Sequence, residues 1–142
     1  MNVLLSIKPK YAEAITEGKK SFEFRKSIFK GNSVERVYLY ATKPISSVVG
    51  SFKVGEIIRR EPKLLWEELG HLSGISSLEF FKYFKNSNMG YAIEIKDLEV
   101  FPKHIDPRQF IEAFNPPRSF RYIDGQFSNI NLNNIKPRNG IM

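Results

Sequence analysis

Three charged residues close together, Lys20, Glu23 and Arg25, have the types and spacing that could do chemistry. Glu23 and Arg25 alternate with Phe22 and Phe24, so a strand here would put the two charges on one face and the two rings on the other. A guanidinium beside a carboxylate can bind a phosphate or a base edge, and a lysine of lowered pKa beside a carboxylate can activate water. The ordinary alternative is a surface ion pair worth about 0 to 1 kcal/mol.

The flanking sequence predicts how these residues are positioned. Residues 2–7 form an apolar segment typical of a short buried strand, and Pro9 suits the first position of a helix. That helix would end at Gly18, a residue suited to the left-handed conformation that closes helices. Ser6 and Lys8, at the end of the first strand, could reach the same site, although capping and solvation are their ordinary roles.

The rest of the chain alternates between strand and helix patterns. The predicted strands are 36–42, 47–59, 90–101 and 119–123, and the predicted helices are 62–70, a segment from 76 to about 86, and a short one beginning at 106. Gly50 and Gly55 interrupt the second of these strands, which favours bulges that let a sheet curl. The pattern predicts a small curled sheet with helices outside it.

The spacing Gly18, Lys20, Glu23, Arg25 gives Gly-x-Lys-x-x-Glu-x-Arg, which resembles the signature of the ASCH domain family. Two flanking segments, Leu5-Ser6-Ile7-Lys8-Pro9 and Gly90-Tyr91-Ala92-Ile93, resemble strands of such domains. The resemblance covers about residues 1–123 and implies an α+β fold, a PUA-like small mixed β-barrel with surrounding helices. Residues 124–142 are expected to form a C-terminal tail, extended or partly disordered.

Composition narrows the classes of protein and partner. Residues 1–60 hold 12 Lys/Arg against 5 Asp/Glu, whereas residues 61–142 hold 10 of each, so the whole net charge of +7 lies in the half that carries the motif. Such a half favours an anionic partner, RNA or a nucleotide or nucleoside, although a charged surface also serves solubility. The chain has no long apolar run and no cysteine. We expect a cytoplasmic protein, no membrane partner and no cofactor.

Metal binding is not expected, because His71 and His104 stand apart with no carboxylate at ligand spacing. Tyr40 and Tyr91, on predicted strands, are candidates for a pocket wall on which a base could stack, although most aromatic residues of small barrels fill the core. The predicted ligand site therefore consists of Lys20, Glu23, Arg25, Ser6, Lys8, Tyr40 and Tyr91.

The resemblance implies a partly wet, basic cleft centred on the motif, and two functions follow. The first is a module that binds RNA or a nucleoside, with Lys20 and Arg25 contacting oxygens and Glu23 accepting from a base amine. The alternative is a hydrolase of a modified nucleoside or of RNA, with Lys20 and Glu23 as candidate catalytic residues. Some ASCH proteins resemble amidohydrolases that use the signature lysine, a threonine and a downstream glutamate; here the threonine position is Glu23, so the hydroxyl is missing.

Overall fold

The computed structural model describes residues 1–30 and 33–125 of the chain. The strands are β1 (Asn2–Ile7), β2 (Phe22–Arg25), β3 (Val37–Ala41), β4 (Ser47–Arg60), β5 (Gly90–Ile105) and β6 (Phe120–Ile123). The helices are α1 (Pro9–Thr16), α2 (Pro62–Leu69) and α3 (Ser77–Tyr83), with 3-10 turns η2 (Gly70–Leu72) and η3 (Pro107–Gln109). Most of the predicted tail, residues 126–142, lies outside the described residues.

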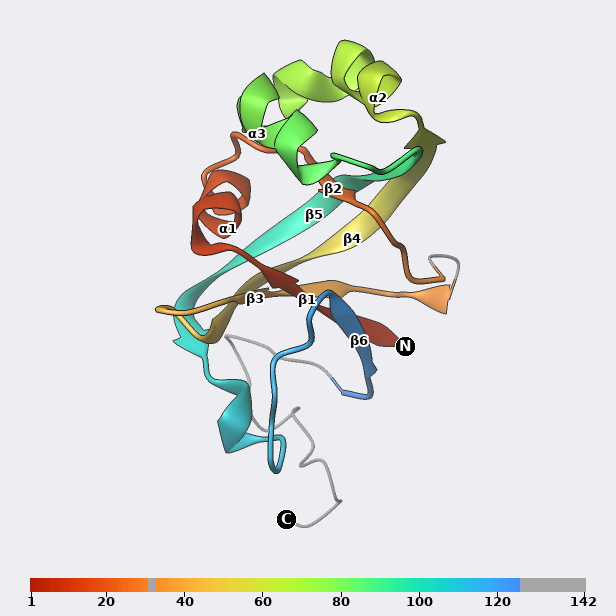
Figure 1. Cartoon of the computed structure of the whole chain (residues 1–142). Coiled ribbons are helices and arrows are strands. Elements are labelled where there is room, and N and C mark those ends of the chain that lie inside the picture. The colour runs from red at the N-terminus through yellow and green to blue at the C-terminus, as the bar shows by residue number, and fades with distance from the viewer. Residues whose placement is uncertain (31–32, 126–142) are drawn as a thin grey trace.

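The six strands form one mixed sheet in the order β2-β5-β4-β3-β1-β6, curled into a half-barrel (Figure 1). β1 and β3 are parallel, and every other neighbouring pair is antiparallel. The order places β2 and β6 at the two edges, so within residues 1–30 and 33–125 the strand that carries the motif pairs with β5 alone. The predicted α+β, PUA-like architecture is confirmed.

Bulges explain how the long β4–β5 pair bends. The register of β4 against β5 shifts between Val48 and Gly50, and again between Val54 and Ile57. Gly50 is required at the first shift, because a Cβ there would lie 2.5 Å from the carbonyl oxygen of Glu99. The predicted interruptions of this strand therefore mark the places where the sheet curls.

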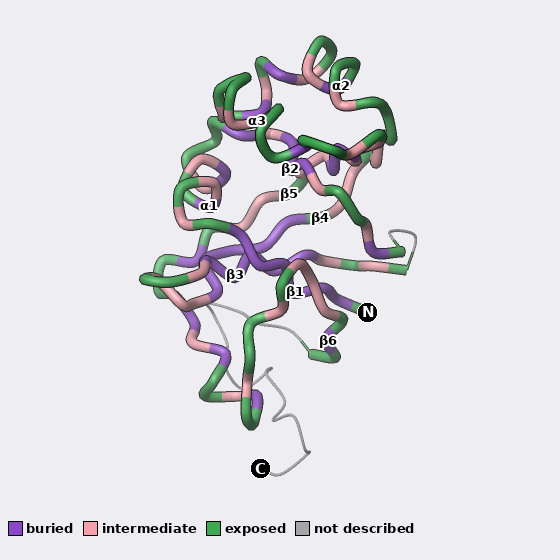
Figure 2. Tube along the Cα trace, viewed as in Figure 1, coloured by how far each residue is buried: buried purple, intermediate pink, exposed green. Residues whose placement is uncertain are grey.

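Much of the central strands is buried (Figure 2), and apolar side chains pack on both faces of the sheet. One face, with Val3, Leu39 and Phe52, is covered by Ala12 and Ile15 of α1. The opposite face is covered by the segment that follows β5, and the outer end of β2 packs against α2 and α3. The helices α2 and α3 lie at one end of the molecule and η3 lies at the other (Figure 1).

Local signals for helix ends are mostly confirmed. Gly18 has φ +77°, and its N–H donates to the carbonyl of Ile15. Ser76 Oγ accepts from the Glu79 N–H at 3.2 Å and so caps α3. The Glu79 carboxylate accepts from Lys10 and Tyr11 of α1, which holds α3 against α1. No helix within residues 1–30 and 33–125 is long and apolar enough to cross a membrane.

Candidate functional site

The motif strand β2 divides its side chains between two environments. Phe22 and Phe24 are buried beneath the helices, and the Phe24 ring meets that of Phe80 edge to face, with centroids 5.2 Å apart. Glu23 and Arg25 point to the other face, where their register partners on β5 are Ile93 and Tyr91. The predicted division of the strand into a core face and a charged face is confirmed.

Lys20 lies inside the protein, with 3% of its surface exposed. Its ammonium donates to the carbonyl of Ser73 at 2.8 Å and lies 3.6 Å from Glu23 Oε1. The ring centroids of Tyr11 and Phe24 lie 5.6 and 5.1 Å from the same nitrogen. Burial lowers the pKa of Lys20 below its ordinary value, and the nearby Glu23 carboxylate partly offsets that effect.

Arg25 extends this network from β2 to β1 and to the residue before β6. Its Nη1 donates to Glu23 Oε2 at 3.1 Å and to the carbonyl of Ser6, at the end of β1, at 3.2 Å. Its Nη2 donates to the Oγ of Ser119, immediately before β6, at 2.8 Å and to the Ser119 carbonyl at 3.3 Å. One side chain therefore ties the edge strand β2 to β1 and to the start of the opposite edge strand.

The expectation of a partly wet motif is wrong for Lys20 and Glu23. Glu23 is 4% exposed, and the Arg25 side chain is 13% exposed. The reason is that Tyr11 of α1, Ser73 just after η2 and Ser119 just before β6 lie against the charged side chains of the motif. The roles of Lys20, Glu23 and Arg25 as ligand contacts remain predictions.

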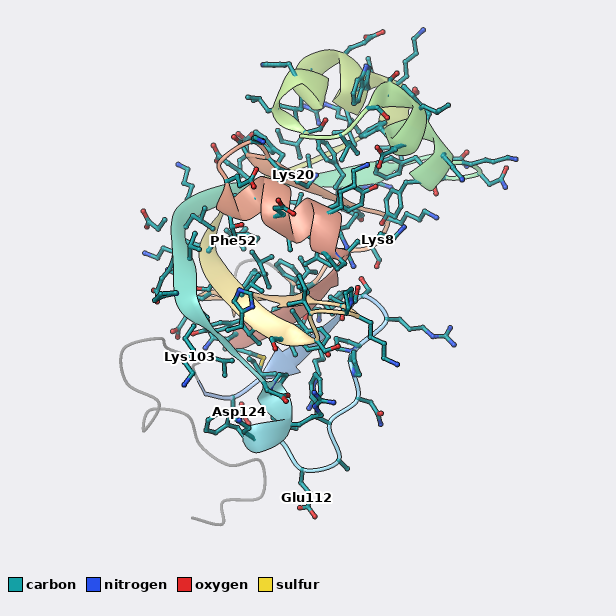
Figure 3. The ribbon with its side chains drawn as sticks, turned by 90° about the vertical axis from the view of Figure 1, so that its left-hand side faces the viewer. Lys8, Lys20, Phe52, Lys103, Glu112 and Asp124 are labelled. Carbon is teal, nitrogen blue, oxygen red and sulfur yellow. The ribbon has the colours of Figure 1, made fainter. Side chains whose placement is uncertain are left out.

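The other predicted site residues do not form one group. Lys8 is exposed at the start of α1, at the opposite end of that helix from Lys20 (Figure 3). Tyr91 is half-buried beside Arg25 in the β2–β5 register. Ser6 is buried, and its Oγ has no hydrogen-bond partner in the described part of the chain.

Tyr40 lies elsewhere, at a cavity of ≈ 370 Å³ on the face of the sheet away from α1. The cavity is lined by Tyr40, Thr42, Lys43, Ser46, Arg108, Phe114 and Pro116. The Tyr40 and Phe114 rings meet with centroids 5.4 Å apart. The cavity thus joins two exposed cations, several hydroxyls and an aromatic wall.

Arg108 is held in place by Asp106 at the start of η3. Its Nε and Nη2 donate to the Asp106 carboxylate at 3.0 to 3.2 Å, and these bonds lower the pKa of Asp106 and raise that of Arg108. Asp106 also accepts from the Arg108 N–H at 3.0 Å, so its side chain caps the start of η3. With 63% of its side chain exposed, the guanidinium can still meet an anion.

The sequence does not predict this second cluster. Lys43 and Ser46 belong to the β3–β4 turn, while Arg108, Phe114 and Pro116 follow β5 more than sixty residues later. No local motif joins the two segments, because the contact depends on the fold of the chain after β5. The spacing of Asp106 and Arg108 indicates a local ion pair, but it does not indicate a cavity.

The cavity and the motif network meet through β1. Ser6 is the register partner of Tyr40, and its N–H donates to the carbonyl of Ser119 at 2.9 Å. Side chains paired in register share a face of the sheet, so the Ser6 hydroxyl lies on the same face as Tyr40. Within the described residues no group of three or more His, Asp or Glu side chains is placed to hold a metal ion.

The fold and this site define a small α+β domain of the PUA-like type, with a buried charged network at β2 and a cavity on the face of the sheet away from α1. The ASCH domain matches the chain over residues 5–103, so this protein belongs to the ASCH domain family. It is 30% identical over 122 residues to a Zymomonas mobilis protein named ASCH domain-containing ribonuclease, covering 84% of this chain and 82% of that protein.

Solved structures from the same organism share the fold. The crystal structure of ASCH from Zymomonas mobilis is 26% identical in sequence, has a TM-score of 0.80, and matches 87% of each chain. A tyrosine-to-phenylalanine variant of that protein has a TM-score of 0.81 at 26% identity, covering 87% of this chain and 90% of the other.

Proposed function

We propose that this protein is a ribonuclease that binds single-stranded RNA at the Tyr40 cavity. The observation that carries the proposal is the 30% identity, over most of both chains, to a protein named as a ribonuclease. The cavity adds chemical support, because an exposed guanidinium, an exposed lysine and aromatic rings are the groups that bind unpaired, stacked nucleotides. The basic first half of the chain agrees with a polyanionic ligand, and RNA agrees with the expected cytoplasmic location.

The cavity residues have distinct roles in this proposal. Arg108, fixed by Asp106, binds a phosphate, and Lys43 adds a second positive charge. Phe114 offers a ring to a base, and the Tyr40 hydroxyl donates to a phosphoryl oxygen. Cleavage would proceed by attack of a ribose 2′-oxygen on the neighbouring phosphorus, which breaks the bond from phosphorus to the 5′-oxygen. The proton of the 2′-hydroxyl is lost and the leaving 5′-oxygen gains a proton.

The sequence-based site fits this proposal in part. Tyr40 contacts RNA directly, and the buried Ser6 hydroxyl lies on the same face of the sheet. Lys20 and Glu23 are buried with protein partners, so in this proposal they do not contact the RNA. The proposed ligand is therefore an RNA strand that crosses the cavity rather than a nucleoside enclosed by the motif.

The test uses a short labelled single-stranded RNA and its DNA counterpart. We expect the protein to bind both strands and to shorten only the RNA, since DNA lacks the 2′-hydroxyl. Lys43→Ala should weaken binding, whereas Lys103→Ala, an exposed lysine outside the cavity, should not. Tyr40→Phe should lower the cleavage rate with little change in affinity. An RNA that stays intact and unbound at low salt would refute the proposal, and turnover of acetylated cytidine alone would point to an amidohydrolase.

A further inference from the structure

The segment between η3 and β6 forms one wall of the cavity and is held at both ends. Phe114 and Pro116, on this segment, line the cavity. At its first end, the Phe110 and Ile111 N–H groups donate to the carbonyl of Pro107. At its second end, Ser119 accepts hydrogen bonds from the Ser6 N–H and from the Arg25 guanidinium. The position of this wall therefore depends on a side chain that belongs to the motif.

The Arg25 guanidinium is hydrogen-bonded to other groups of the protein rather than directed toward solvent or a ligand. Within the part of the chain that the structure describes, the guanidinium donates four hydrogen bonds, to Glu23, Ser6 and Ser119, which leaves few donors for a ligand. Glu23 in turn lies between Arg25 and Lys20, and Lys20 is anchored on the carbonyl of Ser73 in the loop between η2 and α3. The chain of contacts runs from the helices to the cavity wall.

We infer that Arg25 is a positioning residue for the cavity. By holding Ser119 against β1, it fixes the segment 110–119 and so sets where Phe114 and Pro116 meet the RNA, while Glu23 and Lys20 orient the guanidinium. This inference rests on the proposed function for its RNA measurement, but the positioning of the wall stands on geometry alone. The motif thus shapes the ligand site without touching the ligand.

Arginine cannot be replaced by lysine in this role. A lysine has one nitrogen at a single point, whereas the observed contacts need two nitrogens of a planar fork that reach β1 and Ser119 together. Arg25→Lys keeps the charge, so any loss reports geometry and not electrostatic attraction of RNA. Arg59→Lys, an exposed arginine on β4, is the matched control.

Two measurements test the inference. Hydrogen exchange should become faster in residues 110–123 of Arg25→Lys and stay unchanged in the β4–β5 pair. RNA affinity should fall about tenfold in Arg25→Lys, as expected for losing hydrogen bonds from a charged group. In a Phe114→Ala background the same change should cost less than about twofold, because the aromatic ring that Arg25 positions against the RNA has already been removed. Arg59→Lys should change neither quantity.

The outcomes separate the inference from the proposed function. Equal affinity losses in both backgrounds, or unchanged exchange in 110–123, would overturn the positioning role. Failure of the unmodified protein to bind RNA would refute the proposed function, while the exchange measurement would still decide whether Arg25 holds the wall. If Arg25→Lys does not fold, Ser119→Ala removes one of the four bonds, and a smaller rise in exchange confined to 110–123 is expected; no rise would overturn the inference.

Discussion

The motif network and the Tyr40 cavity both contain cations, but their surroundings differ. Lys20 is buried and bonded to protein, whereas Arg108 is largely exposed and bonded to a single carboxylate. Taking a charge out of water costs several kcal/mol unless close partners compensate, which is why the motif charges come as a Lys–Glu–Arg set. A cation with its partners already in place holds the fold, and a cation facing water is free to meet a ligand.

The same comparison explains why the excess of positive charge in the first half of the sequence does not by itself show where a ligand binds. The network carries two positive charges and one negative charge, all directed into the protein, and adds little to the field around it. Lys43 and Lys30 are exposed to solvent, where a positive charge can attract a polyanion. The basic half of the chain and the motif are therefore separate signals, although they overlap in sequence.

The largest effect is expected from the apolar side of the motif strand. Phe24→Ala removes a buried ring that packs on Phe80 and lies beneath the Lys20 ammonium, and it should destabilise the protein by about 3 to 5 kcal/mol through the cavity left behind. Chemical denaturation measures this change. Phe81→Ala, at an exposed ring on α3, is the control and should change stability far less. A small loss for Phe24→Ala would mean that the motif strand is not anchored in the core.

A smaller effect is expected from the buried ammonium. Lys20→Met fills similar space but leaves the Ser73 carbonyl without its donor and Glu23 with one partner fewer, a loss of about 1 to 3 kcal/mol. Lys19→Met, at the exposed neighbouring lysine, is the control. An unchanged melting temperature for Lys20→Met would place the ammonium outside the network that holds the fold.

The same variant has a distinct pH dependence. Because the pKa of Lys20 is lowered in the folded protein, the unfolded chain binds more protons between that pKa and the ordinary value of 10.5. The contribution of Lys20 to stability therefore rises with pH across this window, and Lys20→Met should lack the rise. Tyr11, whose pKa is raised to about 12 mainly by burial, acts in the opposite direction in both proteins, so the difference between them isolates Lys20.

Much of the fold follows from local patterns. The alternation of Phe22 and Phe24 with Glu23 and Arg25 predicted both faces of β2, and Gly18 marked the end of α1. Such signals depend only on residues that are close together along the chain, so they can be recognised in the sequence. The resemblance implied a PUA-like small barrel and the glycines of β4 predicted that the sheet curls. The order of the strands was not predicted, since strand pairing at long range leaves no local trace.

The candidate site was harder to predict because it depends on burial and on distant partners. No property of Lys20 in the sequence shows that the Ser73 carbonyl receives its ammonium, or that Ser119 meets Arg25 from ninety-four residues away. The cavity residues after β5 were missed for the same reason. Tyr40 was proposed for its strand position and type, and the structure places it on the cavity wall.

The smallest expected effect concerns the salt dependence of RNA binding. It most directly distinguishes the motif network from the Tyr40 cavity. Affinity should fall as salt is added, with a slope set by the cations that release counterions from phosphates. Lys43→Ala should reduce that slope by about one unit, because this lysine faces the cavity. Arg25→Lys should lower affinity with the slope unchanged, since its guanidinium is bonded to protein and contacts no phosphate. Binding isotherms at several salt concentrations measure both slopes. A reduced slope for Arg25→Lys would mean that Arg25 contacts a phosphate directly, as the sequence analysis proposed.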